Sequence, residues 1–193
     1  MPLICYYLPD DAEKMTSQLG MNLAQLTRQM LSFKKRFLKN AGFAMTDFTE
    51  LFPDAMLNDA LKLSCHELHT CWFENLGNGK FRKHILPAEA QFAPVNAILA
   101  HDLDGDGKLD LLLAGNEYQA EVMSGRYDAS YGLLLKGNGK GDFLPITNIN
   151  DGVFIKGDVK DMKMIKNATG GQLILAAIND DRMRILRVNK TIK

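Results

Sequence analysis

The chain has 193 residues, of which 46% are hydrophobic and 24% are charged, as expected of a folded globular protein rather than a disordered one. Its 23 Lys and Arg residues equal its 23 Asp and Glu residues, so no net positive charge favours a nucleic-acid partner. Three cysteines do not make a disulfide framework. Residues 1–11 lack the basic and apolar regions of a signal peptide, so we expect either no export signal or a protein whose beginning lies elsewhere. No apolar run reaches transmembrane length, so we expect no membrane span.

The first part of the chain is predicted to be helical. Only two of the 16 glycines, Gly20 and Gly42, lie in residues 1–60. Apolar residues recur every three or four positions over residues 22–39, which predicts an amphipathic helix there. A capping-type start and Pro53 beyond the end predict a second, short helix over residues 46–52. We therefore expect an N-terminal extension with amphipathic helices over residues 1–60.

From residue 61 onward, short apolar runs alternate with Gly, Asn and Asp, which is typical of strands. Residues 72–81 (WFENLGNGKF) parallel residues 133–140 (LLLKGNGK), and each run predicts a hairpin, because Asn-Gly accommodates the positive φ angles of a tight turn. Residues 109–116 and 172–179 also resemble each other, and each predicts a buried strand. This region therefore contains internal repeats.

The repeat spacing of about 60 residues, with about four short strands per unit, suits the blade of a β-propeller. We predict a mainly β fold with an incomplete blade at 61–92, a full blade at 93–146 and a degenerate blade at 152–190. Because a propeller closes with about four to eight blades, these two to three blades form an incomplete propeller. Another chain or a second copy of this one would supply the missing blades.

One acidic loop has the residue pattern of a metal-binding site. Carboxylates stand at loop positions 1, 3, 5 and 9, a glycine at position 6, and position 7 offers its carbonyl oxygen. These residues are Asp102, Asp104, Asp106, Gly107, Lys108 and Asp110. So many oxygen ligands in a flexible loop suit Ca²⁺ better than Mg²⁺. Position 12 is Leu113 rather than the Glu of an EF-hand, so we expect a strand-to-strand calcium loop with a structural ion; the alternative is a solvated acidic turn that binds nothing.

This D-x-D-G-D-G-x-x-D loop runs into a hydrophobic strand, follows residues 94–101 (PVNAILAH) and precedes a Gly-Asn-Gly hairpin. In these features the chain resembles the FG-GAP / VCBS repeats of integrin-α-type β-propellers. Residues 30–189 resemble the C-terminal part of bacterial VCBS/FG-GAP repeat proteins, some of which carry an ASPIC/UnbV domain. The resemblance implies calcium ligands at Asp102, Asp104, Asp106, Asp110 and the carbonyl of Lys108. It also implies an extracellular, periplasmic or cell-surface protein that acts in adhesion or ligand binding.

The sequence departs from that family in two places. The FG-GAP signature is reduced to residues 92–94 (FAP), and the loop of the next repeat is taken to have decayed to Gly157–Asp161, which lacks the acidic spacing. We therefore expect a single metal site. The four histidines are scattered at spacings that suit no zinc site.

A second candidate site is the long connection over residues 116–130, which contains Tyr118, Glu121, Arg126, Tyr127 and Asp128. Long loops rich in Tyr and Arg often bind ligands, although a linker without a ligand is equally consistent with this sequence. The leading hypothesis is a non-enzymatic, calcium-stabilised repeat module that binds a protein or a glycan. The alternatives are a hydrolase or lyase built on a propeller scaffold, and a truncated fragment of a larger repeat protein.

Overall fold

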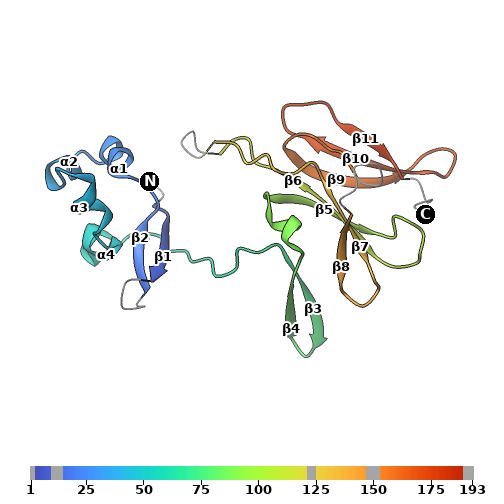
Figure 1. Cartoon of the computed structure of the whole chain (residues 1–193), viewed down its shortest axis with the longest axis horizontal. Helices are drawn as coiled ribbons and strands as arrows, with labels where there is room; N and C mark the ends of the chain where they lie inside the picture. The colour runs from blue at the N-terminus through green and yellow to red at the C-terminus, as the bar shows by residue number, and fades with distance from the viewer. Residues whose placement is uncertain (1–2, 10–14, 121–124, 147–152, 189–193) are drawn as a thin grey trace. The chain divides into compact units, whose positions relative to one another are not determined.

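A computed structural model describes residues 3–9, 15–120, 125–146 and 153–188 of the chain (Figure 1). The chain divides into two compact units, an N-terminal unit of residues 1–65 and a C-terminal unit of residues 66–193. The fold is mainly β, with four small antiparallel sheets and several short helices. No helix in these described ranges has the length and apolar character needed to cross a membrane.

The N-terminal unit begins with a hairpin in which β1 (Cys5–Pro9) pairs antiparallel with β2 (Met15–Leu19). The sequence analysis did not predict this hairpin. Four short helices follow: α1 (Leu23–Gln29), α2 (Phe33–Arg36), α3 (Asn40–Ala44) and α4 (Phe48–Leu51), and then the 3₁₀ turn η1 (Asp54–Met56). The buried core of this unit consists of Leu19, Leu26, Phe33, Phe43, Leu51 and Phe52.

The single amphipathic helix predicted over residues 22–39 is wrong, because the helix stops at Met30 and restarts at Phe33. The cause is tertiary. The guanidinium of Arg36 donates hydrogen bonds to the last carbonyls of α4, to Glu50 O at 2.7 Å and to Leu51 O at 3.1 Å. Phe33 meanwhile packs its ring against Phe52, with 5.2 Å between the ring centroids. The side chains of Phe33 and Arg36 on α2 therefore both contact the end of α4.

The short helix predicted over residues 46–52 is confirmed as α4. Asp47 is its N-cap, and its side chain accepts a hydrogen bond from the backbone N–H of Thr49 at 2.8 Å. The same carboxylate accepts hydrogen bonds from the hydroxyl of Ser17 at 2.8 Å and from the N–H of Ser17 at 3.0 Å. Asp47 therefore joins the start of α4 to β2.

The C-terminal unit contains three antiparallel sheets in which sequence neighbours are paired. The first is the hairpin of β3 (Cys71–Gly77) and β4 (Lys80–Ile85), followed by the 3₁₀ turn η2 (Ala88–Gln91). The second contains β5 (Val95–His101), β6 (Asp110–Gly115), β7 (Leu133–Gly137) and β8 (Phe143–Ile146). The third contains β9 (Val159–Lys166), β10 (Gln172–Ile178) and β11 (Arg184–Arg187).

The predicted hairpins and buried strands are confirmed. Asn78 and Gly79, between β3 and β4, have φ angles of 52° and 72°, as a two-residue turn of this type requires. Residues 133–140 form β7 and the turn into β8, and residues 109–116 and 172–179 contain β6 and β10. These features follow from local sequence, so their positions were predictable.

The four-stranded sheet has a hydrophobic core on each face, and every residue of β6 is buried. Leu112 and Ala114 pack into a cluster with residues of β9 and β10. Leu111 and Leu113, which point to the opposite face, pack with Leu86 and other residues near the β3–β4 hairpin and η2. The three sheets of this unit are therefore layered, with the four-stranded sheet in the middle.

Within this unit β5 lies beside β9, although the two strands belong to different sheets. The amide of Asn96 on β5 donates a hydrogen bond to the carbonyl of Val159 on β9 at 3.1 Å. The sheets of the described residues do not close into a barrel or ring, so the predicted propeller blades are not confirmed. The coarser prediction, a mainly β fold with a helical N-terminal segment, is confirmed.

Candidate metal centre

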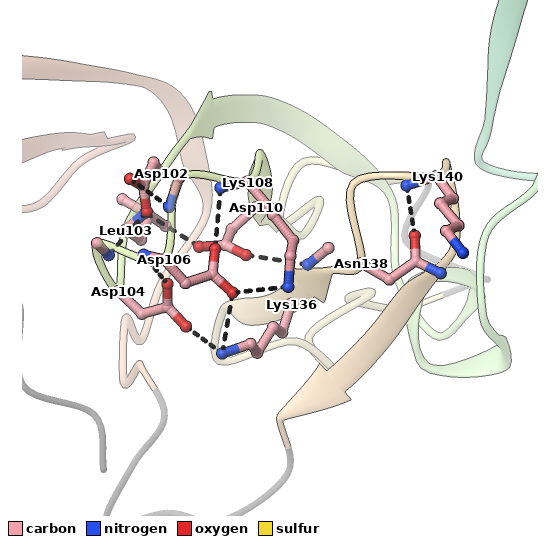
Figure 2. Close-up of polar contacts among 12 residues, drawn as sticks. Asp102, Leu103, Asp104, Asp106, Lys108, Asp110, Lys136, Asn138 and Lys140 are labelled. Carbon is pink, nitrogen blue, oxygen red and sulfur yellow. Dashed lines mark hydrogen bonds and ion pairs between the residues drawn. The ribbon is translucent and has the colours of Figure 1, made fainter.

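The acidic loop connects the end of β5 to the start of β6, as predicted (Figure 2). One carboxylate oxygen from each of Asp102, Asp104 and Asp106 lies within 4.8 Å of the others. Gly105 and Gly107 have φ angles of 84° and 82°, a conformation that other residues rarely adopt. The two glycines therefore allow the turn that brings the three carboxylates together.

The carboxylates also bind the backbone of their own loop. Asp102 accepts hydrogen bonds from the N–H of Gly105 at 2.7 Å and from the N–H of Gly107 at 3.1 Å. Oδ1 of Asp104 accepts from the N–H of Asp106 at 3.0 Å, and Oδ1 of Asp106 accepts from the N–H of Lys108 at 2.9 Å. This last bond is the main reason that the pKa of Asp106 is lowered. The loop is thus shaped by short-range side-chain to backbone bonds.

Two carboxylate oxygens remain, Oδ2 of Asp104 and Oδ2 of Asp106, and both face the ammonium group of Lys136 on β7 (Figure 2). Lys136 forms an ion pair and a hydrogen bond with Asp104 and lies 3.4 Å from Asp106. The hydrogen bond to Asp104 is the main reason that the pKa of Lys136 is raised. The ammonium of Lys108 lies 3.3 Å from the same oxygen of Asp106.

Sequence reasoning did not identify Lys136 as a site residue. It is 32 positions from Asp104, in the run that predicted only a hairpin. No local motif signals this contact, because the pairing of β6 with β7 creates it.

Asp110, which the sequence analysis placed among the ligands, lies apart from the cluster of three carboxylates. It is the first residue of β6 and is 2% exposed. Its Oδ2 accepts a hydrogen bond from the N–H of Leu103 at 3.0 Å, and its Oδ1 accepts one from the N–H of Gly137 at 2.9 Å. Asp110 therefore joins the start of the loop to the end of β7.

The donor set fits a hard divalent cation. The side-chain donors are all carboxylate oxygens, which Ca²⁺ prefers. The carboxylates of Asp102, Asp104, Asp106 and Asp110 outnumber the ammonium groups of Lys108 and Lys136 near them, so the local charge favours a cation. The carbonyl of Lys108 and the carboxylate of Asp110 are further ligands in the predicted set, and their role in binding stays a prediction.

The candidate ligand-binding loop is partly described. The guanidinium of Arg126 lies over the ring of Tyr118, 5.0 Å from its centroid. Glu117 and Tyr127 exchange two backbone hydrogen bonds, of 2.9 and 3.0 Å, and the side chains of Tyr127 and Asp128 are exposed. The structure thus brings Tyr118 and Arg126 together, whereas Glu121 lies outside the described residues.

A polar cluster closes the base of this loop, and sequence reasoning did not identify it. Asn116 is 1% exposed; its amide donates hydrogen bonds to Ser130 O at 2.8 Å and to Gly157 O at 2.9 Å, and its Oδ1 accepts from the N–H of Ser130 at 3.0 Å. Nearby, the ammonium of Lys160 lies 2.8 Å from the buried carboxylate of Asp158 and 3.1 Å from Glu117. Asn116 therefore joins the two ends of the loop, and Asn116 and Glu117 fix its start to β9 and to the segment that precedes it.

The segment predicted to be a second, decayed acidic loop lies at a different place in the fold. Gly157–Asp161 leads into β9 and forms its start, so it is not the connection between the first two strands of the third sheet. That connection is residues 167–171, where Oδ1 of Asn167 accepts hydrogen bonds from the N–H groups of Thr169 at 3.1 Å and Gly171 at 2.7 Å. The loop has an Asn where the acidic loop has Asp102, and its remaining residues carry no carboxylate.

Comparison of the chain with protein-family models, with curated proteins and with solved structures finds no match. The resemblance to FG-GAP / VCBS repeats therefore stays a prediction from the motif and its context.

Proposed function

We propose that this protein is a non-enzymatic, calcium-binding β-repeat module, in which the ion would stabilise the β5–β6 connection. The observation that supports the proposal is the convergence of Asp102, Asp104 and Asp106, whose ligand oxygens lie within 4.8 Å of one another. Three carboxylates this close repel one another unless positive charge is placed among them. The carboxylates also hold the backbone of their loop, which favours a structural role over a catalytic one.

The proposal is tested by isothermal titration calorimetry with CaCl₂, together with thermal melts in calcium and in excess chelator. A ligand that binds only the folded state raises its melting temperature, so we expect calcium to raise the midpoint. Asp104→Ala should remove both the binding heat and the shift. Asp128→Ala, which removes an exposed carboxylate from another loop, should retain both. A folded wild-type chain with no calcium heat and no shift would contradict the proposal.

We also propose that the 116–130 loop binds a protein or a glycan at a cell surface. In support, the exposed Arg126 and the partly buried Tyr118 form a cation–π pair, and Tyr127, next to Arg126 in the sequence, is 50% exposed. Aromatic and Arg side chains are enriched at the centres of binding sites. In a binding screen against immobilised glycans and surface proteins, Tyr127→Ala should abolish any signal that the wild-type chain gives, and Leu144→Ala, an exposed control on β8, should not.

We propose that one face of the β3–β4 hairpin, here called its outer face, binds a second copy of the chain. Phe73, Phe81 and Ile85 lie on this face by strand alternation and are 57%, 60% and 52% exposed. Exposed apolar patches of this kind mark interaction sites. Light scattering after size exclusion should show an oligomer that Phe81→Lys disrupts, and a wild-type chain that stays monomeric at high concentration would contradict this assignment.

A further inference from the structure

The geometry of the acidic loop points to a residue that regulates the proposed calcium site. We infer that Lys136 is a tethered competitor for the cation: its ammonium occupies the anionic cluster when calcium is absent and must leave when calcium binds. This inference rests on the proposed function, because it concerns the same site. Lys136 would therefore set the affinity of the site for calcium.

The ammonium group of Lys136 lies against two carboxylates of the acidic loop. Each of Asp104 and Asp106 uses its Oδ1 for the loop backbone and directs its Oδ2 to Lys136 (Figure 2). These two oxygens of the cluster accept no bond from a backbone N–H of the loop, although Oδ2 of Asp106 also faces the ammonium of Lys108 at 3.3 Å. They are therefore the oxygens best able to coordinate an ion once the ammonium groups move away. The ammonium of Lys136 therefore stands where the two available ligand oxygens converge.

Asp104 and Lys136 differ in how far their side chains are exposed to solvent. The carboxylate of Asp104 is only 6% exposed, whereas the side chain of Lys136 is 42% exposed. Lys136 thus shields Asp104 from water while its own flexible four-carbon chain reaches solvent. It can move out of the cluster without unfolding β7, because its backbone pairing with Leu144 on β8 does not depend on the side chain.

The ammonium group of Lys136 weakens calcium binding in two ways. A tethered ammonium acts at a high effective concentration, and a group that occupies a site weakens the apparent affinity of any competing ligand. Removing the ammonium also removes a positive charge about 3 to 4 Å from the carboxylates, where charges interact most strongly. Both effects have the same sign, so we expect Lys136→Met to bind calcium about tenfold more tightly than the wild type.

The test is calcium titration by calorimetry of the full chain in the wild type, Lys136→Met and Lys140→Met. Lys140 lies in the turn that follows β7, and no ion pair joins its ammonium to a carboxylate among the described residues, so it controls for the loss of one positive charge nearby. Lys136→Met should bind about tenfold more tightly, and Lys140→Met within about twofold of the wild type. Lys136→Gln is the second variant if Lys136→Met does not fold.

A direct readout comes from the ammonium group itself. In proton–nitrogen NMR spectra of the lysine side chains, the signal of the paired Lys136 ammonium should disappear or shift to the solvent-exposed position on addition of calcium. The signal of Lys140 should not change.

The outcomes separate the two proposals. Calcium binding that is tighter in Lys136→Met than in the wild type and in Lys140→Met supports the inference. Equal affinity in Lys136→Met and Lys140→Met overturns the inference and leaves the calcium site intact. No binding heat in any folded variant, the wild type included, overturns both the inference and the proposed calcium site.

Discussion

The carboxylate of Asp110 accepts a hydrogen bond from the backbone N–H of Gly137 at 2.9 Å, which ties the first residue of β6 to the last residue of β7. Its other oxygen accepts from the N–H of Leu103, inside the acidic loop, at 3.0 Å. One buried side chain therefore fixes the loop to two neighbouring strands. These two hydrogen bonds are made by protein groups alone, and they help to hold the shape of the loop.

Asp110→Asn tests the contribution of these two hydrogen bonds to stability. The amide nitrogen of Asn would face one of the two N–H donors, so one hydrogen bond is lost and a buried donor is left unpaired. We expect a loss of about 2 kcal/mol in the free energy of unfolding, measured by urea denaturation in excess chelator so that calcium cannot contribute. Asp128→Asn, at an exposed position, should change stability by less than about 0.5 kcal/mol. Equal stability of the two variants would show that the hydrogen bonds of Asp110 do not contribute to the free energy of unfolding.

Gly137→Ala tests the close approach of the backbone at the same point. A Cβ atom on residue 137 would lie 1.9 Å from the carbonyl oxygen of Leu109, so the β6–β7 register must shift or separate. We expect a loss of more than about 3 kcal/mol or failure to fold. Gly170→Ala is the control, since its φ is +81° but no atom lies within 4 Å of the added Cβ, and it should cost about 1 kcal/mol. Circular dichroism melts distinguish the two results.

Asn116→Gly tests the closure of the candidate ligand-binding loop. Glycine accommodates the φ of 86° at this position, so the variant removes three side-chain hydrogen bonds without adding backbone strain. We expect the amide of Ser130 to exchange its hydrogen more than tenfold faster, as measured by NMR. The amides of β10 should be unaffected. Unchanged protection at Ser130 would mean that Asn116 does not hold the loop.

Asp47 makes the stability of the N-terminal unit depend on pH. Hydrogen bonds from the Thr49 N–H and from Ser17 lower the pKa of Asp47 to about 2, below the value of about 3.9 expected in the unfolded chain. The carboxylate therefore stabilises the folded state above about pH 4, and this contribution is lost as the pH falls from about 4 to 2. We expect it to amount to about 1 kcal/mol, as for other N-caps.

Asp47→Asn provides the check on this pH dependence. Hydrogen exchange at the amides of Ser17 and Thr49 should become faster in the wild type between pH 4 and pH 2, after correction for the intrinsic exchange rate. In Asp47→Asn exchange should already be faster at pH 7, and its corrected rate should not vary across this window. Parallel pH profiles in the two proteins would contradict the assignment.

The parts of the structure that were predicted correctly depend on residues close together in the sequence. The Asn78–Gly79 turn needs positive φ angles, and Asn and Gly adopt them at lower cost than other residues do. The bonds that shape the acidic loop span two to five residues. Asp47 caps α4 through a residue two positions away. Local rules of this kind can be read from the sequence before any fold is known.

The errors and omissions arose where distant segments meet. The helix predicted over residues 22–39 breaks because Arg36 and Phe33 contact the end of α4, 14 to 19 positions later. The β1–β2 hairpin was missed because its strand β1 has no alternation of buried and exposed residues. The loop taken as the counterpart of the acidic loop was misplaced because only the strand order identifies the equivalent connection.

By itself the sequence determined the mainly β character, the hairpins of the C-terminal unit and the three carboxylates that converge in the acidic loop. The tertiary structure alone decided that Asp110 bonds to Gly137 and that Lys136 enters the acidic cluster. The physical reason is that local turn geometry is set within a few residues. By contrast, pairing β6 with β7 brings together groups 27 and 32 positions apart, and that pairing depends on the layered hydrophobic core.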